Sequence, residues 1–365
     1  MTAGGGGPRV RGTRAAARHG SATRGRIPEL VVALVVAVAA VSYAAGRGGD
    51  PATQGPPTAP GPVDAGPSEL AALVIRGATV PFVAVVGAGP SRAPAVVALP
   101  PALTFTAPGQ GEASATDVAG FPGDSMRVAV SNAVGAWATH YGVLDLDGLG
   151  ALVDGAGGIT IDLPEPAVAG PNVLGPGEVT LDGRGTVTFL FDADRAAVTE
   201  RFMFVLRALL EAPPELSGES LLATDDAAGL LGILRAARGA DVTLPPTRRV
   251  AGTVTVPDQP AFDSYLQQLF GTPPPIRAIV QNGSGEPAIG EAVARKLIPA
   301  GFRIVLSGNA ESFDHRITDV LAEGPENIEV ARRARRALGV GRVALSQVPS
   351  GIGDITIVVG KDFTG

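Results

Sequence analysis

The stretch LAALVIRGATVPFVAVVGAGPSRAPAVVAL, residues 70–99, decides the fold. It holds three short apolar runs rich in β-branched residues, at 70–75, 80–86 and 95–99, which glycine and proline separate. Runs of this length, bounded by turn residues, are typical of strands buried on both faces of a sheet. We therefore expect three neighbouring strands at the centre of the protein.

Helical patterns alternate with strands further along the chain. Residues 124–141, 146–153 and 196–210 are predicted to be helices, and residues 157–166 form a strand entered through a glycine turn. This alternation indicates an α/β protein with a mixed sheet flanked by helices. In the last ninety or so residues we expect strands at 276–280, 302–306 and 355–359 and helices at 290–300 and 325–338, which form a small C-terminal α/β domain.

Proline-rich segments mark the domain boundaries. Residues 47–67, RGGDPATQGPPTAPGPVDAGP, read as an extended linker. The break GTPPP at 271–275 separates a body at 68–270 from a C-terminal module at 276–363. We expect few contacts to cross this second break, because domain boundaries fall in exposed linkers.

The N-terminal region indicates a membrane anchor. Residues 1–29 hold six arginines and one acid, and LVVALVVAVAAVSYAA follows without a charge from Leu30 to Ala45. A transmembrane helix at 30–46 would leave 1–29 as a cytoplasmic tail and place the body outside the cell membrane. The alternatives are a cleaved signal peptide with its site at Ser42–Ala44 and a buried soluble helix.

Composition excludes several function classes. The chain of 365 residues contains no cysteine and three histidines far apart in sequence, so thiol catalysis and Cys- or His-based metal sites are not expected. The net charge is −6, and the six N-terminal arginines make the rest of the chain more acidic still. Nucleic acid is therefore not an expected partner, since binding phosphates requires clustered cations.

The stretch GAWATHYGVLDLDGLGALVDGAGGITIDLPEP, residues 135–166, resembles a segment of the LytR-CpsA-Psr cell-wall ligases. The matching positions are His140, Tyr141, Asp145, Gly148, Gly157, Gly158 and Asp162. PGEVTLDG at 176–183 resembles a turn of the same family. VQNGSG, GFRIVLSGNA and ITIVVGKDF resemble the LytR C-terminal domain, so the resemblance covers about residues 68–363.

The resemblance implies transfer of a glycopolymer from a polyprenyl-pyrophosphate carrier to peptidoglycan. It also implies an apolar pocket for the lipid, with arginines and a divalent cation at the pyrophosphate. That chemistry fits those groups, because a pyrophosphate leaving group develops negative charge that arginine forks and a metal stabilise.

The chain departs from the family at the expected ligand positions. Pro101, Phe191, Ala193 and Val198 stand for arginines, Ala102 for an aspartate, and Phe202 and Met203 for glutamines. The loop at 76–79, RGAT, lacks the family's aspartate. Of the arginines expected at the ligand positions, one is retained, as Arg201. Because neutral side chains do not replace arginine on a dianion, the body at 68–270 is predicted to be a degenerate domain of this family.

The resemblance and these departures from it together predict a membrane-anchored extracytoplasmic protein, without catalysis or cofactor, that takes part in cell-wall polymer assembly or binding. The alternative is an active phosphotransferase with Mg²⁺, using Arg201, Arg195, Asp192 and Asp194. Two carboxylates at i and i+2 share a metal only if a loop folds them together, and a solvated turn is the commoner case. His140, Tyr141 and Trp137 are expected to be packing residues.

Two features of the C-terminal module are candidates for binding peptidoglycan, a wall glycopolymer or another envelope protein. The turn NGSG, formed by Asn282, Gly283, Ser284 and Gly285, presents backbone N–H groups to an anion or is simply a tight turn with glycine at positive φ. The predicted helix near the end carries Arg332, Arg333, Arg335 and Arg336 at helical spacing. That face contacts an acidic polymer or is a solvated charged surface.

The membrane anchor leads to a direct prediction. In a fractionated culture, the intact untagged chain is expected in the membrane pellet, since a charge-free run preceded by arginines inserts with its N-terminus inside. N-terminal sequencing distinguishes the alternatives. A mature N-terminus at Ala45, or full-length protein in the medium, would rule out the anchor.

Overall fold

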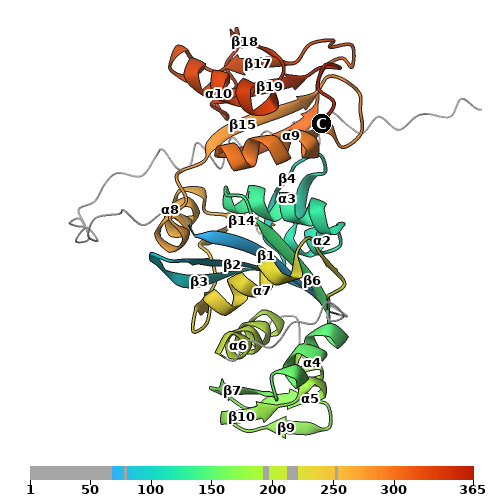
Figure 1. Ribbon diagram of the computed structural model, residues 1–365, viewed down its shortest axis with the longest axis vertical. Helices are drawn as coiled ribbons and strands as arrows, with labels where there is room; N and C mark the ends of the chain where they lie inside the picture. Colours follow the sequence, from blue (N-terminus) through green and yellow to red (C-terminus); the bar gives the residue numbers. More distant parts are fainter. Residues whose placement is uncertain (1–67, 78–79, 192–196, 212–220, 251–253) are drawn as a thin grey trace, which may run out of the picture. The chain divides into compact units, whose positions relative to one another are not determined.

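The computed structural model describes residues 68–77, 80–191, 197–211, 221–250 and 254–365 (Figure 1). The predicted tail, anchor and linker at 1–67 lie outside these described residues. Within the described ranges, no helix is both long enough and apolar enough to span a bilayer.

A mixed six-stranded sheet forms the centre of the body, as the sequence predicts. Its strand order is β11-β6-β1-β2-β3-β12. The pairs β1–β2, β2–β3 and β11–β6 are antiparallel, whereas β1–β6 and β3–β12 are parallel. The bounds are β1 Glu69–Arg76, β2 Phe82–Gly89, β3 Arg92–Leu99, β6 His140–Asp145, β11 Ala223–Thr224 and β12 Asp241–Thr243.

Both faces of this sheet are buried, which explains the uninterrupted apolar runs. Leu73 and Ile75 of β1 point into one core, and Ala72 and Val74 point into the other. Figure 1 shows α7 across one face of the sheet. The first core takes in α4 Leu146–Gly155, α5 Gly183–Phe191, α6 Val198–Glu211 and α7 Ala227–Ala236. The second takes in α2 Ala115–Ala119, α3 Gly123–Val134 and α8 Gln259–Phe270.

The helix predicted at 124–141 is seven residues too long at its C-terminal end. Helix α3 ends at Val134 because Gly135 adopts φ +70° and caps it. A Cβ on Gly135 would lie 2.6 Å from Arg303 Nη2, so this position also requires a glycine for space. Trp137 falls in the following connection, half-buried, with Arg127 stacked 4.9 Å from its ring centroid.

Smaller sheets complete the body. The antiparallel pair of β7 Ile159–Leu163 and β10 Gly177–Leu181 begins after the predicted glycine turn, where Gly157 and Gly158 both have positive φ. Residues 183–191 are a helix, α5. The remaining hairpins are β4 Thr104–Ala107 with β5 Gly111–Ser114, β8 Ala167–Ala169 with β9 Asn172–Leu174, and β13 Thr247–Val250 with β14 Val254–Pro257.

The C-terminal module is the small α/β domain that the sequence predicts, with two further strands. Its sheet has the order β16-β15-β19-β17-β18. The strands are β15 Ile276–Asn282, β16 Phe302–Asn309, β17 Asp319–Ala322, β18 Arg342–Leu345 and β19 Ile355–Val359. The helices are α9 Ile289–Leu297 and α10 Ile328–Leu338, with short 3-10 turns at Ile298–Ala300 and Pro325–Asn327. The module has its own apolar core, to which α3 contributes Val128.

The body and the C-terminal module are joined through the buried side chain of Asn132 on α3. Its Oδ1 accepts a hydrogen bond from Ile304 N at 2.7 Å, and its Nδ2 donates to Ile304 O at 2.8 Å and to Thr106 O at 2.9 Å. The amide thus pairs with strand β16 as a neighbouring strand would. The two bonds to Ile304 are buried, and the loss of a partner by a buried backbone group is expensive.

Arg303, beside Ile304, reinforces the same junction. It is 6% exposed, donates from Nε to Asn132 O at 3.2 Å, and pairs through Nη1 with Asp263 of α8 at 2.5 Å. Burial lowers the pKa of this guanidinium, and the charge of Asp263 opposes that effect. A buried arginine with a single carboxylate partner holds that partner firmly, because separation would leave a charge unpaired.

Polar contacts at the rim extend the junction. Asp124 of α3 pairs with Arg295 of α9 at 2.6 Å, and Ser125 donates to Glu291 at 2.9 Å. Burial alone would raise the pKa of Asp124, but Arg127 and Arg295 together lower it below its ordinary value. The expectation that few contacts cross the GTPPP break is therefore wrong. Proline and glycine marked where the chain changes module, but they carry no information on how the modules pack.

Replacing Asn132 by alanine tests this junction. The substitution would leave the N–H and C=O of Ile304 buried without partners, so we expect a loss of about 2–4 kcal/mol in the free energy of unfolding. Urea denaturation of residues 48–365 measures it. Asn172→Ala, in an exposed hairpin position, is the matched control and should change stability little. Equal effects of the two substitutions would contradict the assigned role of Asn132.

Candidate functional site

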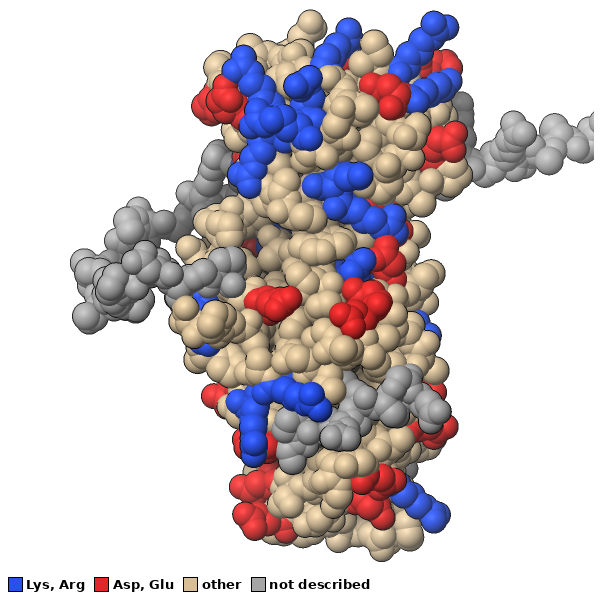
Figure 2. Space-filling view, viewed as in Figure 1, with Lys and Arg blue, Asp and Glu red and all other residues tan. Residues whose placement is uncertain are grey.

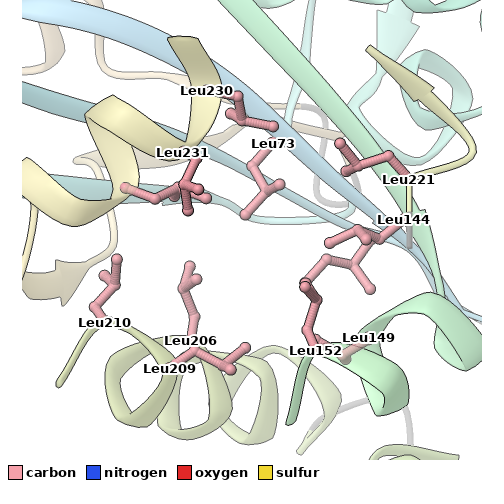
Figure 3. Close-up of a pocket in the computed structure, with 12 residues that line it drawn as sticks. Leu73, Leu144, Leu149, Leu152, Leu206, Leu209, Leu210, Leu221, Leu230 and Leu231 are labelled. Carbon is pink, nitrogen blue, oxygen red and sulfur yellow. The ribbon is translucent and has the colours of Figure 1, made fainter. Parts of the chain in front are cut away.

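An apolar pocket lies between the central sheet and the helices of the first core. Figure 3 shows leucine side chains from β1, β6, α4, α6 and α7 converging on it. The cavity itself has a volume of about 30 Å³, and the space around it, counted together with open solvent, amounts to about 500 Å³. Its described lining consists of Leu73, Ile75, Leu144, Leu149, Leu152, Leu206, Leu209, Leu210, Leu221, Leu230, Leu231 and Leu234.

The chemistry of this pocket follows from its lining. Every lining residue is leucine or isoleucine, so water inside it would find no side-chain hydrogen-bond partner. Displacing such water by hydrocarbon is favourable, at about 25 cal/mol for each Å² of apolar surface removed from water. A wall of this chemistry suits an apolar group, and its described side chains provide no group that would activate or cleave a ligand.

Arg201, the retained arginine, is engaged with the backbone. Its Nη1 donates to Phe189 O at 2.5 Å and to Val168 O at 2.8 Å, and its guanidinium lies 4.7 Å from the Phe189 ring centroid. These contacts tie α6 to the end of α5 and to the β8–β9 hairpin. In this arrangement, Arg201 stabilises the fold around the pocket.

The neighbouring substituted positions are apolar and mostly packed. Val198 is 5% exposed, and Phe202 is 2% exposed and stacks on Phe82 with ring centroids 5.0 Å apart. Met203 packs partly against the same core. Phe191, by contrast, is 58% exposed at the end of α5. The side of α6 on which the family resemblance implied polar ligands is thus an apolar contact surface.

The other candidates near the predicted ligand positions do not form a described anion or metal site. Asp192, Ala193, Asp194 and Arg195 lie outside the described residues. Arg76 donates to the backbone oxygens of Ala119 and Phe121 at 3.0 and 3.1 Å. The side chains of Pro101 and Ala102 offer no metal ligand, and the described residues contain no group of three acidic or histidine side chains that could hold a metal ion. The described candidates therefore offer no set of ligands for the Mg²⁺ that the family implies, and Asp192 and Asp194, the carboxylates of the alternative, are not among them.

The NGSG turn satisfies its own hydrogen bonds. Asn282 Oδ1 accepts from Ser284 N at 3.2 Å, Ser284 Oγ at 3.1 Å and Gly285 N at 2.9 Å. Gly283 N donates to Val359 O at 3.0 Å, and Glu286 N donates to Ser284 Oγ at 3.2 Å. Gly285 has φ +83°, as the tight-turn interpretation predicted. The backbone donors of the turn are therefore already used within the fold.

The arginine-rich helix is α10, and its four arginines are exposed. Ala331, Ala334 and Leu338 face the core of the module, while Arg332, Arg333, Arg335 and Arg336 face outward. Arg332 forms an ion pair with Glu329 one turn earlier. The predicted helical spacing is confirmed.

A cluster of charged residues at the start of β6 was not found from the sequence. Asp225 accepts from Tyr141 N at 3.0 Å and from Arg127 Nη1 at 2.9 Å, and it lies 3.7 Å from His140 Nδ1. It therefore fastens the segment before α7, which covers the pocket, to the edge of the sheet. In the sequence, two aspartates before a helix indicate only an N-terminal cap, and Asp226 does cap α7. The contacts of Asp225 with β6 and α3 could not be inferred from that pattern.

Residues 276–363 match the family model LytR_C, described as "LytR cell envelope-related transcriptional attenuator". The C-terminal module is a LytR_C domain. The match covers about a quarter of the chain and confirms the resemblance that the sequence indicated for this part. No curated protein matches the chain in sequence.

Solved structures similar to the chain include LytR-CpsA-Psr proteins. TagV from Bacillus subtilis is 15% identical, with a TM-score of 0.47 over 57% of this chain and 99% of its own. The LytR-Csp2A-Psr enzyme from Actinomyces oris is 18% identical, with a TM-score of 0.44 over 55% of this chain and 90% of its own. TagT with bound octaprenyl pyrophosphate lipid is 17% identical, with a TM-score of 0.43 over 56% and 91%.

The position of Arg201 leads to a prediction about stability. Arg201→Ala removes the donor to two backbone oxygens and the contact with Phe189, and we expect a loss of about 1–3 kcal/mol in the free energy of unfolding. Urea denaturation measures the loss. Arg207→Ala on the same helix is the matched control, because its side chain is 47% exposed and lies 3.9 Å from Asp241. A shift no larger for Arg201 than for Arg207 would contradict its structural role.

Proposed function

We propose that this protein is a membrane-anchored, extracytoplasmic cell-envelope protein whose body binds an apolar chain without transferring the group attached to it. One observation carries the proposal: the described pocket wall is entirely leucine and isoleucine, in a chain that also carries a LytR_C domain. The ligand would be the polyprenyl tail of a lipid carrier. The protein would serve the assembly or binding of a cell-wall polymer.

The absence of catalysis in this proposal rests on side-chain chemistry. A pyrophosphate leaving group requires arginines or a metal to take up its charge. Arg201 donates to backbone oxygens, and Val198 and Phe202 are buried among apolar side chains. The body would then act as a carrier-binding or scaffold domain, held at the membrane by the segment from Leu30 to Ala45. Peptidoglycan, a wall glycopolymer or another envelope protein would be its partner.

Calorimetric titration with polyprenyl phosphate and polyprenyl pyrophosphate tests the proposal on residues 48–365. Because the pocket would recognise the tail, we expect similar dissociation constants for the two lipids, within about threefold, with or without Mg²⁺. We also expect no release of the group attached to the carrier when a glycan-linked lipid is supplied. Mg²⁺-dependent turnover that Arg201→Ala abolishes would establish the alternative, an active phosphotransferase.

A pocket substitution locates the binding. Leu231 lines the pocket and is half-buried, so Leu231→Gln introduces an amide that a bound hydrocarbon cannot satisfy. We expect binding of both lipids to weaken about tenfold. Leu222→Gln is the control, since Leu222 is 54% exposed and does not line the pocket. Unchanged binding in Leu231→Gln, or no lipid binding by the unmodified chain, would refute the proposed use of this pocket.

A further inference from the structure

The outer face of α10 carries more positive charge than the stability of the helix requires. Arg332 and Arg335, Arg333 and Arg336, and Arg332 and Arg336 are neighbours on the helix surface, at i,i+3 or i,i+4. Like charges at these spacings repel and weaken a helix. The helix dipole favours cations in the last turn, which accounts for Arg335 and Arg336 but not for the other two.

Neighbouring carboxylates do not neutralise this face. Glu329 pairs with Arg332, and the described residues provide no ion pair for the other three arginines. Three other acids of the module pair elsewhere, Asp354 with Arg277, Asp319 with Arg342 and Glu291 with Arg295. Figure 2 shows the basic side chains gathered over α10.

Part of this face is also held in place. The guanidinium of Arg333 lies 5.7 Å from the ring centroid of Phe302, which is fully buried. Gly301, next to Phe302, leaves room for it: a Cβ there would lie 2.9 Å from Arg333 Nη2. A braced arginine loses less side-chain freedom when it binds, so the entropic penalty of using it is smaller.

We propose that the arginine face of α10, formed by Arg332, Arg333, Arg335 and Arg336, is the docking surface for a soluble linear polymer that carries phosphodiester or carboxylate groups. Guanidinium forks match both anions and stay charged at any physiological pH. Arg332 and Arg336 are separated by about 6 Å along the helix axis, so successive anionic groups of one chain can meet successive arginines.

The composition of the face favours a soluble polymer over a membrane surface. A helix that lies on a bilayer inserts large apolar side chains among its basic ones. On α10 the exposed positions carry no large apolar residue, and Ile328 and Val330 are half-buried. The inference deepens the proposed function and rests on it for one point only, the identification of the natural polymer as a wall glycopolymer.

Fluorescence anisotropy with labelled polyphosphate and labelled polygalacturonate tests the docking surface on the full-length chain in nonionic detergent. We expect both polymers to bind at low salt and to weaken steeply as salt rises, because the contacts are exposed. Replacing the four arginines of α10 by glutamine should weaken binding at least about tenfold and flatten the salt dependence. Melting curves by circular dichroism confirm that the variant folds.

A matched control separates a local surface from net charge. Glutamine at four exposed arginines of the body removes the same charge and should change binding less than about twofold. These are Arg184, Arg235, Arg238 and Arg249. Equal weakening by the two quadruple variants, or no weakening by the α10 variant, would overturn the docking surface.

Two further probes test the class of partner. Vesicles of anionic lipid and duplex DNA are titrated with the same variants. If either binds more tightly than polyphosphate and polygalacturonate, and loses this binding in the α10 variant, the choice of a soluble wall-type polymer is overturned. The α10 variant should bind polyprenyl phosphate as the unmodified chain does. Failure of the arginine face is therefore distinguishable from failure of the leucine pocket.

Discussion

Burial of the central sheet on both faces is the constraint on which the rest of the body depends. Strand β1 has Leu73 and Ile75 on one side and Ala72 and Val74 on the other, all nearly inaccessible to water. Such a sheet requires a layer of helices on each face. On one face, α4, α6 and α7 provide that layer, and the space left between their leucines and the strands is the pocket. The candidate site is thus a product of how the core is covered.

The second face of the sheet determines how the LytR_C domain is attached. Helix α3 packs there with Met126 and Ala129, and from the same helix Asn132 bonds to strand β16 of the domain. Helix α3 therefore contacts the cores of both modules. Arg303 and Asp263 add a buried ion pair to the junction. An interface made of directional hydrogen bonds and a buried charge fixes one orientation, because any other arrangement would leave these groups unpaired.

Local sequence patterns predicted the parts of the fold that depend on periodicity and turn residues. The three central strands, α4, α6 and most of the C-terminal elements were found because apolar spacing and glycine turns are local signals. The end of α3 was missed although Gly135, which caps the helix at φ +70°, is a local helix-stop signal, whereas its close contact with Arg303 is a tertiary feature that the sequence does not reveal. For the site, the sequence predicted loss of polar ligands at Val198 and Phe202. It could not predict that Arg201 would bond to backbone oxygens, since those partners come from distant segments.

The uniform lining of the pocket has a consequence for how it would discriminate among ligands. Leucine and isoleucine offer dispersion contacts that depend on distance and hardly on orientation. A hydrocarbon held by them alone has no fixed register, so it is free to slide and to rotate about its long axis. Selection in such a site rests on the width and branching of the chain, and on how much of it fits. If the pocket binds a hydrocarbon as proposed, the leucine wall would select ligands by chain width and length, and recognition of any head group would fall to residues elsewhere.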